Sequence, residues 1–437
     1  MFKKFFQGIH PPTNKHFTAG KPIKDLPLPE KLYISTHQNI GAASQPVVAV
    51  GEKVRKGQVI AQADAFVSAP IHAPTSGEIV DLISKSYSPC GECEYIVLQP
   101  DFQDNWLTGL NQPQAWESFS SDELKARIQA HGLVGMGGAA FPTHVKLQPP
   151  SSKQLEILVV NGAECEPYLT ADHRTMLESA TELFTGIAII LKILSLKQAY
   201  IGIESNKADA IALLRQLNPP ENIQIVELPC QYPQGAEKML IKTILQREIP
   251  SGGLPMDVGV IVQNVSTLVA VARAVCQNIP LIERTVTIAG DCIAEPQNVR
   301  ARIGTTLQFA IEACGGFTQQ PAKILLGGPM MGIAQNSLSV PIIKSTCGIL
   351  ALSPKLAEIP AEHACIRCGS CVTACPMQLL PNMLSILGER RLFNVAKEEY
   401  HLLDCIECGC CTFVCPAKRN IVQYIRLLKL LNAQNNK

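Results

Sequence analysis

The pattern of apolar and polar positions changes along the chain and marks four units. From Lys31 to about Leu98, short β-branched runs alternate with turn residues, which is typical of a small all-β domain. The next stretch alternates apolar strands with helical segments and predicts a parallel sheet covered by helices. A hairpin-like pair of strands with one helix follows, and the last stretch is helical. We therefore predict a multidomain α/β protein with units at residues 1–120, 121–282, 283–350 and 355–437.

The second unit has the clearest pattern of elements. Ser121 is expected to cap its first helix, because acidic residues follow in the first turn. Apolar runs predict strands at Leu155–Gly162, Gln198–Glu204 and Ile223–Leu228. Helical spacing predicts helices near residues 177–196, 207–217 and 235–246. Such an open, Rossmann-like sheet binds ligands beyond the carboxyl ends of its strands.

Composition and charge exclude several classes of protein. Hydrophobic residues make up 46% and charged residues 17% of the 437 residues, which is a globular composition. The net charge of +1 shows no excess of basic residues of the kind that binds nucleic acid. Met1–Phe6 lacks an apolar segment of signal-peptide length, so export is not expected. The longest apolar run, Leu183–Leu196, is too short to span a bilayer, so a membrane location would depend on another subunit.

Eight of the 17 cysteines form two runs that read C-x2-C-x2-C-x3-C-P. This is the spacing of bacterial ferredoxins, in which three thiolates hold one 4Fe-4S cluster and the fourth crosses to the other cluster. We therefore expect two clusters, each with a remote ligand from the other run. The first set is Cys365, Cys368, Cys371 and Cys415. The second set is Cys405, Cys408, Cys411 and Cys375.

Other uses of these cysteines are less favoured. Zinc also binds thiolate quartets, but zinc ribbons pair C-x2-C knuckles and lack the third cysteine and the C-P ending. A disulfide framework is not expected in a long chain with no mark of secretion. Gly369 and Gly409 follow the second cysteine of each run, where a tight turn would require positive φ. Cys90 and Cys93 form an isolated C-x2-C pair, for which surface thiols are favoured over a metal site.

A glycine-rich stretch, GLVGMGGAAFPTHVKL, begins at Gly132. Gly135, Gly137 and Gly138 would let the backbone approach a ligand and point amide hydrogens at an anion, and Lys146 can add positive charge. A flexible turn is the alternative, because a glycine-rich loop alone is a weak signal.

An acidic loop follows the first predicted strand of the same unit. Glu164 and Glu166 lie there, at the carboxyl end of an open sheet. Carboxylates at this position can accept hydrogen bonds from ribose hydroxyls or from the nicotinamide amide. A pair of helix-capping residues is the alternative interpretation.

Four segments resemble, in order and approximate spacing, the flavin- and NADH-binding subunit of respiratory complex I. They are GLVGMGGAAFPTHVKL, VVNGAECEPYLTADHR, YPQGAEKMLI and NVSTLVAVARAV. The resemblance implies bound FMN and NADH as substrate, with Asn161 and Asn264 joining the glycines, Lys146 and the two glutamates as cofactor-binding residues. Hydride transfer to a flavin needs no side-chain acid or base, so no catalytic residue is expected. The chain departs from the family pattern at Val134, Met136, Ala140, Ala236 and Ser266.

The flanking units also resemble known domains. VAVGEKVRKGQVIAQ and APIHAPTSGEIVDL are similar to the barrel-sandwich of biotinyl and lipoyl carriers, but Asp64–Val67 replace the tip that bears a carrier's lysine, so the carrier function is not expected. The proline-rich first 30 residues predict an extended arm on a later domain. The segment from Arg284 to about Gly328 resembles a soluble-ligand-binding β-grasp domain, expected to brace the flavin unit. The last unit resembles a helical two-cluster ferredoxin domain, with an amphipathic helix at Ile421–Leu431.

The complete order of domains resembles the C subunit of the Rnf (Rsx) ion-translocating electron-transport complexes. The resemblance implies a subunit that moves electrons between NAD(H) and partner subunits or ferredoxin through FMN and two 4Fe-4S clusters. It also implies a peripheral position on the cytoplasmic face of the bacterial inner membrane. Two alternatives stay open. One is a non-catalytic iron-sulfur relay or scaffold subunit, and the other is the diaphorase subunit of a soluble hydrogenase, against which the N-terminal barrel argues.

Overall fold

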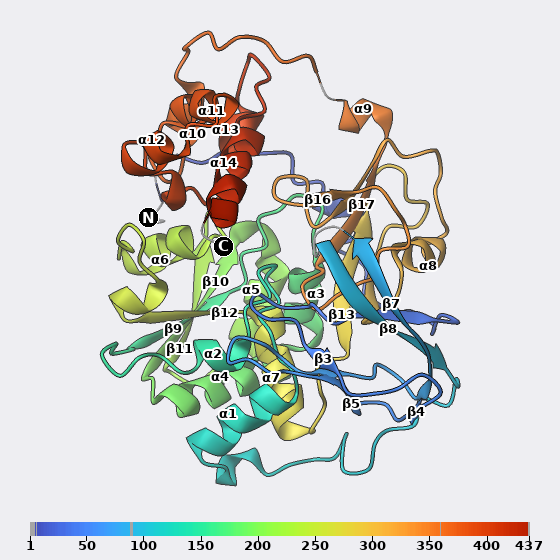
Figure 1. The fold of residues 1–437 in the computed structure, drawn as a ribbon. Coiled ribbons are helices and arrows are strands. Elements are labelled where there is room, and N and C mark those ends of the chain that lie inside the picture. The colour runs from blue at the N-terminus through green and yellow to red at the C-terminus, as the bar shows by residue number, and fades with distance from the viewer. Residues whose placement is uncertain (1–4, 6, 88–90, 359, 436–437) are drawn as a thin grey trace.

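The computed structural model describes the chain except residues 1–4, 6, 88–90, 359 and 436–437 (Figure 1). Its strands form four sheets, with six, four, four and three members. The helical last unit lies above α6 (Glu237–Leu245) in Figure 1, and the linker after α9 (Pro354–Ala357) crosses the top of the view to reach it. Cys90, half of the predicted C-x2-C pair, lies outside the described residues.

The first unit is a barrel-sandwich of two small sheets, as the resemblance to carrier domains implied. Its core consists of fully buried aliphatic side chains, including Leu32, Ile60 and Ile96. The four-stranded sheet has the order β2 (Leu32–Ser35), β8 (Gly91–Pro100), β7 (Gly77–Tyr87) and β4 (Lys53–Val54). The three-stranded sheet has the order β3 (Gln45–Pro46), β5 (Val59–Gln62) and β6 (Ile71–His72).

The second unit is built on a four-stranded parallel sheet, as predicted. Its order is β11 (Ile223–Leu228), β10 (Gln198–Glu204), β9 (Ile157–Asn161) and β12 (Val260–Asn264). Successive residues of β9 point to opposite faces and both faces are buried, which explains the unbroken apolar run. One face packs against α1 (Ser121–Ala130), α4 (Ala180–Leu194), α5 (Ala208–Gln216) and α7 (Val265–Cys276), and the other packs against α6.

Two details of this unit differ from the sequence prediction. The N-cap of α1 is Ser120 rather than Ser121, because Ser120 forms a reciprocal capping box with Glu123. The single helix expected at residues 177–196 is divided into α3 (Ala171–Glu178) and α4 by a break at Ser179, whose backbone leaves the helical region.

The third unit is a mixed sheet with one short helix, α8 (Leu307–Glu312), in agreement with the predicted β-grasp. Its strand order is β1 (Lys24–Asp25), β14 (Gln297–Arg302), β13 (Glu283–Ala289), β17 (Gly348–Leu352), β15 (Lys323–Leu326) and β16 (Ile333–Gln335). Strand β1 belongs to the N-terminal arm and pairs in parallel with β14. The arm also pairs at Ile9 with Tyr232, so it lies on later domains as expected.

The last unit contains five helices among its described residues. They are α10 (Ser370–Ala374), α11 (Pro381–Glu389), α12 (Phe393–Glu398), α13 (Cys410–Phe413) and α14 (Ile421–Asn435). The amphipathic helix α14 packs on its own unit, since Ile421, Ile425 and Leu428 are buried in the core formed with the cysteines. Its basic side chains Arg426 and Lys429 both pair with Glu407, at 3.2 and 2.9 Å.

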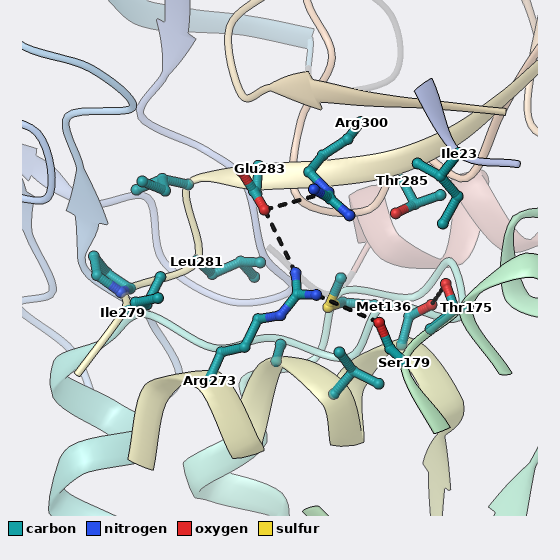
Figure 2. Close-up of a pocket in the computed structure, with 15 residues that line it drawn as sticks. Ile23, Met136, Thr175, Ser179, Arg273, Ile279, Leu281, Glu283, Thr285 and Arg300 are labelled. Atoms are coloured by element: carbon teal, nitrogen blue, oxygen red, sulfur yellow. Dashed lines mark hydrogen bonds and ion pairs between the residues drawn. The ribbon is translucent and has the colours of Figure 1, made fainter. Parts of the chain in front are cut away.

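A charged seam joins the first three units. Glu283 at the start of β13 lies between Arg273 of α7 and Arg300 of β14, with N–O distances of 3.5 and 3.6 Å (Figure 2). Glu283 also pairs with Arg302 at 3.2 Å, and Arg302 continues to Asp104 of the first unit at 2.9 Å. The pocket beside these residues measures only about 50 Å³. The charged residues that line this pocket pair with one another and connect the domains. The pocket itself is too small for a nucleotide.

A buried lysine marks the junction of the same three units. Lys344 is 1% exposed, and its ammonium group donates to the carbonyl oxygens of Pro70 at 2.8 Å and Gly132 at 2.7 Å. Burial lowers the pKa of Lys344 to about 7. The two nearby histidines, His72 and His131, are also buried, and burial lowers their pKa values as well. The junction therefore favours neutral side chains.

We expect this junction to make stability depend on pH. The folded-state pKa of Lys344 lies below its ordinary value of 10.5, so the unfolded chain binds one more proton between about pH 7 and 10.5. The free energy of unfolding should therefore rise by about 1.4 kcal/mol per pH unit from this group. Urea titrations at pH 7, 8 and 9 should show a smaller rise for Lys344→Met than for the wild type. The exposed-lysine control Lys355→Met should keep the wild-type slope, and an unchanged slope in Lys344→Met would contradict the assignment.

Candidate functional site

A cleft of about 540 Å³ opens at the carboxyl edge of the parallel sheet. Asn161 ends β9 and Asn264 ends β12, and the two residues are paired across these strands. The chain proceeds from β9 to β10 and β11 on one side, whereas β12 adds on the other side. The cleft therefore lies where the strand order reverses, the position at which open α/β sheets bind ligands. Its volume is in the range of cofactor sites.

The glycine-rich loop forms one wall of the cleft. A bridge between Val134 and Pro142 closes the loop at its base, and the N–H of Gly135 donates to the carbonyl of Phe141 at 2.8 Å. Gly138 has a φ of +112°, which favours glycine. Gly137 borders the cleft, where an added Cβ would stand 3.4 Å from the Cβ of Asn264.

The tip of this loop fits an anionic group. Among the hydrogen bonds of the described residues, none uses the backbone N–H of Gly137, Gly138 or Ala139. The preceding amide, of Met136, donates instead to the hydroxyl of Thr267 at 2.9 Å, which fixes the start of the tip. Consecutive free amides in a turn form a concave donor site suited to a phosphate.

The loop is braced from two other units. The N–H of Ile40 in the barrel donates to the carbonyl of Ala140 at 3.1 Å. Arg284 of the β-grasp, 2% exposed, donates to the carbonyls of Met136 at 3.0 Å and Thr346 at 3.1 Å. No carboxylate among the described residues forms an ion pair with Arg284. Arg284 therefore places a buried positive charge behind the glycine-rich loop, which has Val134 and Met136 where the related family has arginines. The sequence analysis did not predict this role of Arg284.

The predicted acidic residues border the cleft but bind backbone groups. The Glu164 carboxylate accepts from the amides of Asp172 at 3.0 Å and His173 at 3.2 Å, at the start of α3. The Glu166 carboxylate accepts from the amides of Met330 at 3.1 Å and Met331 at 2.8 Å. Burial raises the pKa of Glu164 to about 7 and also raises that of Glu166. Both side chains thus help to hold the walls together, and their role toward NADH stays a prediction.

The two asparagines have a similar arrangement. Asn161 donates to the carbonyl of Gly235 at 2.9 Å, and Asn264 caps α7 and donates to Asp172 at 2.7 Å. They join the ends of β9 and β12 to the neighbouring loops and so shape the floor of the cleft.

The structure places Lys146 away from the cleft lining. Its ammonium group pairs with Glu237 at 2.7 Å, and Lys238 at the start of α6 lines the cleft instead. Lys238 was not predicted from the sequence, although it lies in the segment YPQGAEKMLI that carries the family resemblance. The contribution of Lys146 to phosphate binding therefore stays a prediction.

The cysteines gather around two separate cavities in the last unit. One cavity is lined by Cys365, Cys368, Cys371 and Cys415, and the other by Cys375, Cys405, Cys408 and Cys411 together with Cys410, which lies off the spacing. Each group contains the remote cysteine that the spacing assigned to it. The two loops also have the same backbone conformation at corresponding positions. Arg367 and Glu407 both have positive φ, and so do Gly369 and Gly409.

The chemistry of these thiols fits iron-sulfur clusters. Burial raises the pKa of Cys405 to about 11 and also raises that of Cys371 and Cys375. Such thiols become thiolates when a metal binds them. Leu379 and Leu384 line the cavity of the second set, and Ile421 lines the cavity of the first set.

One cysteine loop reaches the cleft. Ile406 and Cys408 line it together with Tyr232, which is 2% exposed. The Tyr232 hydroxyl donates to the carbonyl of Cys408 at 2.8 Å, and this bond ties the cleft to the loop. Cys368, the counterpart of Cys408 in the other loop, is exposed. The second set therefore reaches the cleft through Cys408, and the first set reaches solvent through Cys368.

Four family models match successive parts of the chain. They describe an RnfC barrel sandwich hybrid domain at residues 3–103, a Nuo51 FMN-binding domain at 128–273, an SLBB domain at 285–334 and a 4Fe-4S dicluster domain at 364–419. The C subunit of the proton-translocating ferredoxin:NAD(+) oxidoreductase complex of Clostridium ljungdahlii is 53% identical over 432 residues, which are 99% of this chain and 94% of that protein. The chain belongs to the family of Rnf C subunits.

Other relatives agree with this family. The C subunit of the Na(+)-translocating ferredoxin:NAD(+) oxidoreductase complex of Acetobacterium woodii is 41% identical over 97% of this chain and 96% of its own length. Among solved structures, an NAD+-reducing [NiFe]-hydrogenase in the air-oxidized state matches with a TM-score of 0.53 at 16% identity, over 73% of this chain and 64% of that one. This likeness concerns the fold alone.

These matches confirm the predicted family, the order of fold types, and the FMN and 4Fe-4S cofactors of an Rnf C subunit. None of the described helices is long and apolar enough to cross a bilayer.

We predict that the cysteine sets are crossed as the cavities suggest. The wild-type chain purified without oxygen should hold about eight irons, and Cys375→Ser should lose about half of them. Adding Cys405→Ser should remove no more iron, because both residues serve one cluster. Adding Cys365→Ser should remove the rest.

The control for this experiment is Cys410→Ala. Cys410 is buried beside Cys411 but lies off the C-x2-C-x2-C spacing, and its thiol donates to the carbonyl of Tyr232 at 3.9 Å, so this variant should keep its iron. Stoichiometric zinc with little iron in the wild type would contradict the cluster assignment. Loss of all iron in Cys375→Ser alone would contradict the independence of the two sites.

Proposed function

We propose that this chain moves electrons between NADH and the one-electron partners of a membrane-bound, ion-translocating ferredoxin:NAD+ oxidoreductase complex. FMN, when bound, supplies the conversion between a two-electron hydride and single electrons. The observation that carries the proposal is that the cleft at the sheet edge and the second cysteine set share a wall, formed by Ile406 and Cys408. A flavin site and a cluster site in contact allow electrons to pass without leaving the protein.

The proposed roles of the residues follow from their positions. The free amides of Gly137 and Gly138 hold the FMN phosphate, and Gly135 closes the turn that presents them. The buried Arg284 adds positive charge from behind the loop. Lys146 retains its predicted role only if the phosphate displaces Glu237 from it.

The remaining predicted residues belong to the nucleotide side and the floor of the cleft. Glu164 and Glu166 lie at the edge of the cleft and orient NADH there. Asn161 and Asn264 form the floor of the cleft. The proposed domain boundaries at residues 120 and 282 precede α1 and β13, whereas the boundary at 350 falls within β17 (Gly348–Leu352).

The order of the centres is also part of the proposal. Electrons pass between the cleft and the set Cys375, Cys405, Cys408 and Cys411, and then to the set near Cys368, which is open to partners. We place the subunit on the cytoplasmic face of the membrane, held there by other subunits. NADH and an ion-translocating membrane partner are thereby connected through one chain.

Gly137→Val tests the flavin site. The valine Cβ would stand 3.4 Å from Asn264, and its methyl groups would fill the space proposed for FMN. We expect the variant to lose flavin absorbance while keeping its iron content and its melting temperature. Gly20→Val, at an exposed position with open space around it, is the matched control. Full flavin retention by Gly137→Val would show that the loop is only a turn, and absence of flavin from the wild type would favour the relay or scaffold alternative.

Glu166→Gln tests the nucleotide side of the cleft. The change keeps the shape of the side chain and removes its negative charge, so we expect slower NADH-dependent flavin reduction with a raised apparent Kd for NADH. Flavin and iron contents should stay at wild-type values. Glu237→Gln, in the same cleft, is the charge control. A lowered melting temperature with unchanged NADH affinity would instead assign Glu166 to holding the turn at Met330 and Met331.

A further inference from the structure

The two cysteine loops are internal repeats that differ at two of their seven positions. Cys365–Cys371 reads CIRCGSC and Cys405–Cys411 reads CIECGCC. The differing pairs are Arg367 with Glu407 and Ser370 with Cys410. Ser370 and Cys410 lie off the C-x2-C-x2-C spacing, so neither is expected to hold iron. Each nevertheless stands two residues after the second cysteine of its run.

The backbone of each loop brings this residue close to a ligand sulfur. The preceding glycine, Gly369 or Gly409, has a φ of +79° or +78°, and a short helix begins directly after it. Ser370 and Cys410 are the first residues of these helices, α10 and α13. Their backbone N–H groups therefore have no acceptor within the helix. Both the side chain and the amide of this residue are available to the cysteine before the glycine.

In the first loop the neighbouring side chain is a hydroxyl. The Cys368 thiol donates to the hydroxyl of Ser370 at 3.4 Å. A metal-bound thiolate has no proton to donate, so in that state the hydroxyl is the donor of the same contact. Hydrogen bonds with the side chain and with the backbone N–H of Ser370 lower the pKa of Cys368, so they favour its thiolate.

In the second loop the neighbouring side chain is a thiol. A hydrogen bond with the Cys410 side chain lowers the pKa of Cys408, and the backbone N–H of Cys410 acts in the same direction. Cys410 is fully buried, and its thiol also contacts the carbonyl oxygen of Tyr232 at 3.9 Å. A thiol is a weaker hydrogen-bond donor than a hydroxyl. The sulfurs of Cys368 and Cys408 therefore receive the same backbone bond but side-chain bonds of unequal strength.

The surroundings of the two sulfurs differ in the same sense. Cys408 is buried in an apolar cluster with Ile9 and Tyr232, whereas Cys368 is exposed. One-electron reduction adds a negative charge to an iron-sulfur centre, and both water and hydrogen-bond donors stabilise that charge. The hydroxyl and the exposure together favour reduction of the first set.

The other differing position does not separate the two loops. Glu407 pairs with both Arg426 and Lys429, at 3.2 and 2.9 Å, which leaves one net positive charge beside the second loop. Arg367 is exposed and places one positive charge beside the first loop. The difference between Ser370 and Cys410 therefore remains as the one that acts directly on a ligand sulfur.

We propose that Ser370 and Cys410 are positioning residues that set the reduction potentials of the two iron-sulfur centres through hydrogen bonds to the sulfurs of Cys368 and Cys408. The hydroxyl makes the first set the more easily reduced one, and the thiol keeps the second set at a lower potential. Each reduction adds one electron, and no bond forms or breaks. The proposal rests on the two clusters and not on the proposed route of the electrons, because a reduction potential is an equilibrium quantity.

The test is an anaerobic redox titration of the full, iron-loaded chain with dithionite and mediators, followed by electron paramagnetic resonance. The wild type should show two one-electron steps, and the step at higher potential should persist in Cys375→Ser, which is expected to keep only the first set. Cys410→Ser exchanges a thiol for a hydroxyl and should favour reduction of the second set about tenfold, a rise of about 59 mV. Ser370→Ala should disfavour reduction of the first set by a similar factor, and Ser370→Thr should keep the wild-type value.

Thr373→Ala is the matched control, because the Thr373 hydroxyl of the same helix donates to the carbonyl of Gly369 at 3.4 Å rather than to a sulfur. Its two potentials should equal those of the wild type. Iron content and melting temperature should be unchanged in all the variants at positions 370, 373 and 410, which separates a shifted potential from loss of a centre.

Three results would overturn the proposal. One is wild-type potentials in both Ser370→Ala and Cys410→Ser, and another is an equal shift in Thr373→Ala. The third is a first set that is reduced at a lower potential than the second. Flavin binding and NADH oxidation do not enter this titration, so the proposed function is tested separately.

Discussion

The hydrogen bond from the Tyr232 hydroxyl to the Cys408 carbonyl connects the α/β unit, which holds the cleft, to the cysteine-bearing unit. The relative position of the two cofactor sites depends on this boundary. Electron transfer needs two cofactor sites at a short and constant separation, yet the cleft and the cysteine loops belong to different folding units. The bond lies inside an apolar cluster of Ile9, Tyr232, Ala374, Cys408 and Cys410, which excludes water from the boundary. In this setting a single neutral hydrogen bond is strong, because no solvent competes for the carbonyl.

The units around the cleft act mainly as braces. The glycine-rich loop is held by the barrel through Ile40 and by the β-grasp through Arg284. The acidic loop is held by the turn at Met330 and by Lys15 of the arm, whose ammonium group donates to the carbonyls of Glu166 and Leu169. The tip residue Phe66 of the barrel packs edge-on against the ring of His144, which follows the glycine-rich loop. Each wall of the cleft therefore depends on a segment distant in sequence.

This dependence explains which features the sequence could predict. Strands β10 and β11 begin and end at the predicted residues because each is an apolar run bounded by polar turns. The grouping of the eight cysteines follows from spacing alone, which a cubane cluster dictates. Arg284 and Tyr232 escaped prediction because their roles arise from contacts between units. Asn161 and Glu164 line the cleft and also bind backbone groups of neighbouring loops, which the sequence did not predict because those contacts join distant segments.

The N-terminal arm has a consequence for how the protein is made. Gly8 donates to the carbonyl of Ala374, and Ile9 exchanges hydrogen bonds with Tyr232, so the arm binds to segments that are synthesised much later than itself. The barrel and the α/β unit can fold in sequence as they emerge, since each has its own core. The contact of the arm with Ala374 cannot form until the cysteine-bearing unit has been synthesised. The closed arm therefore marks a chain in which the cysteine-bearing unit has taken its place beside the α/β unit.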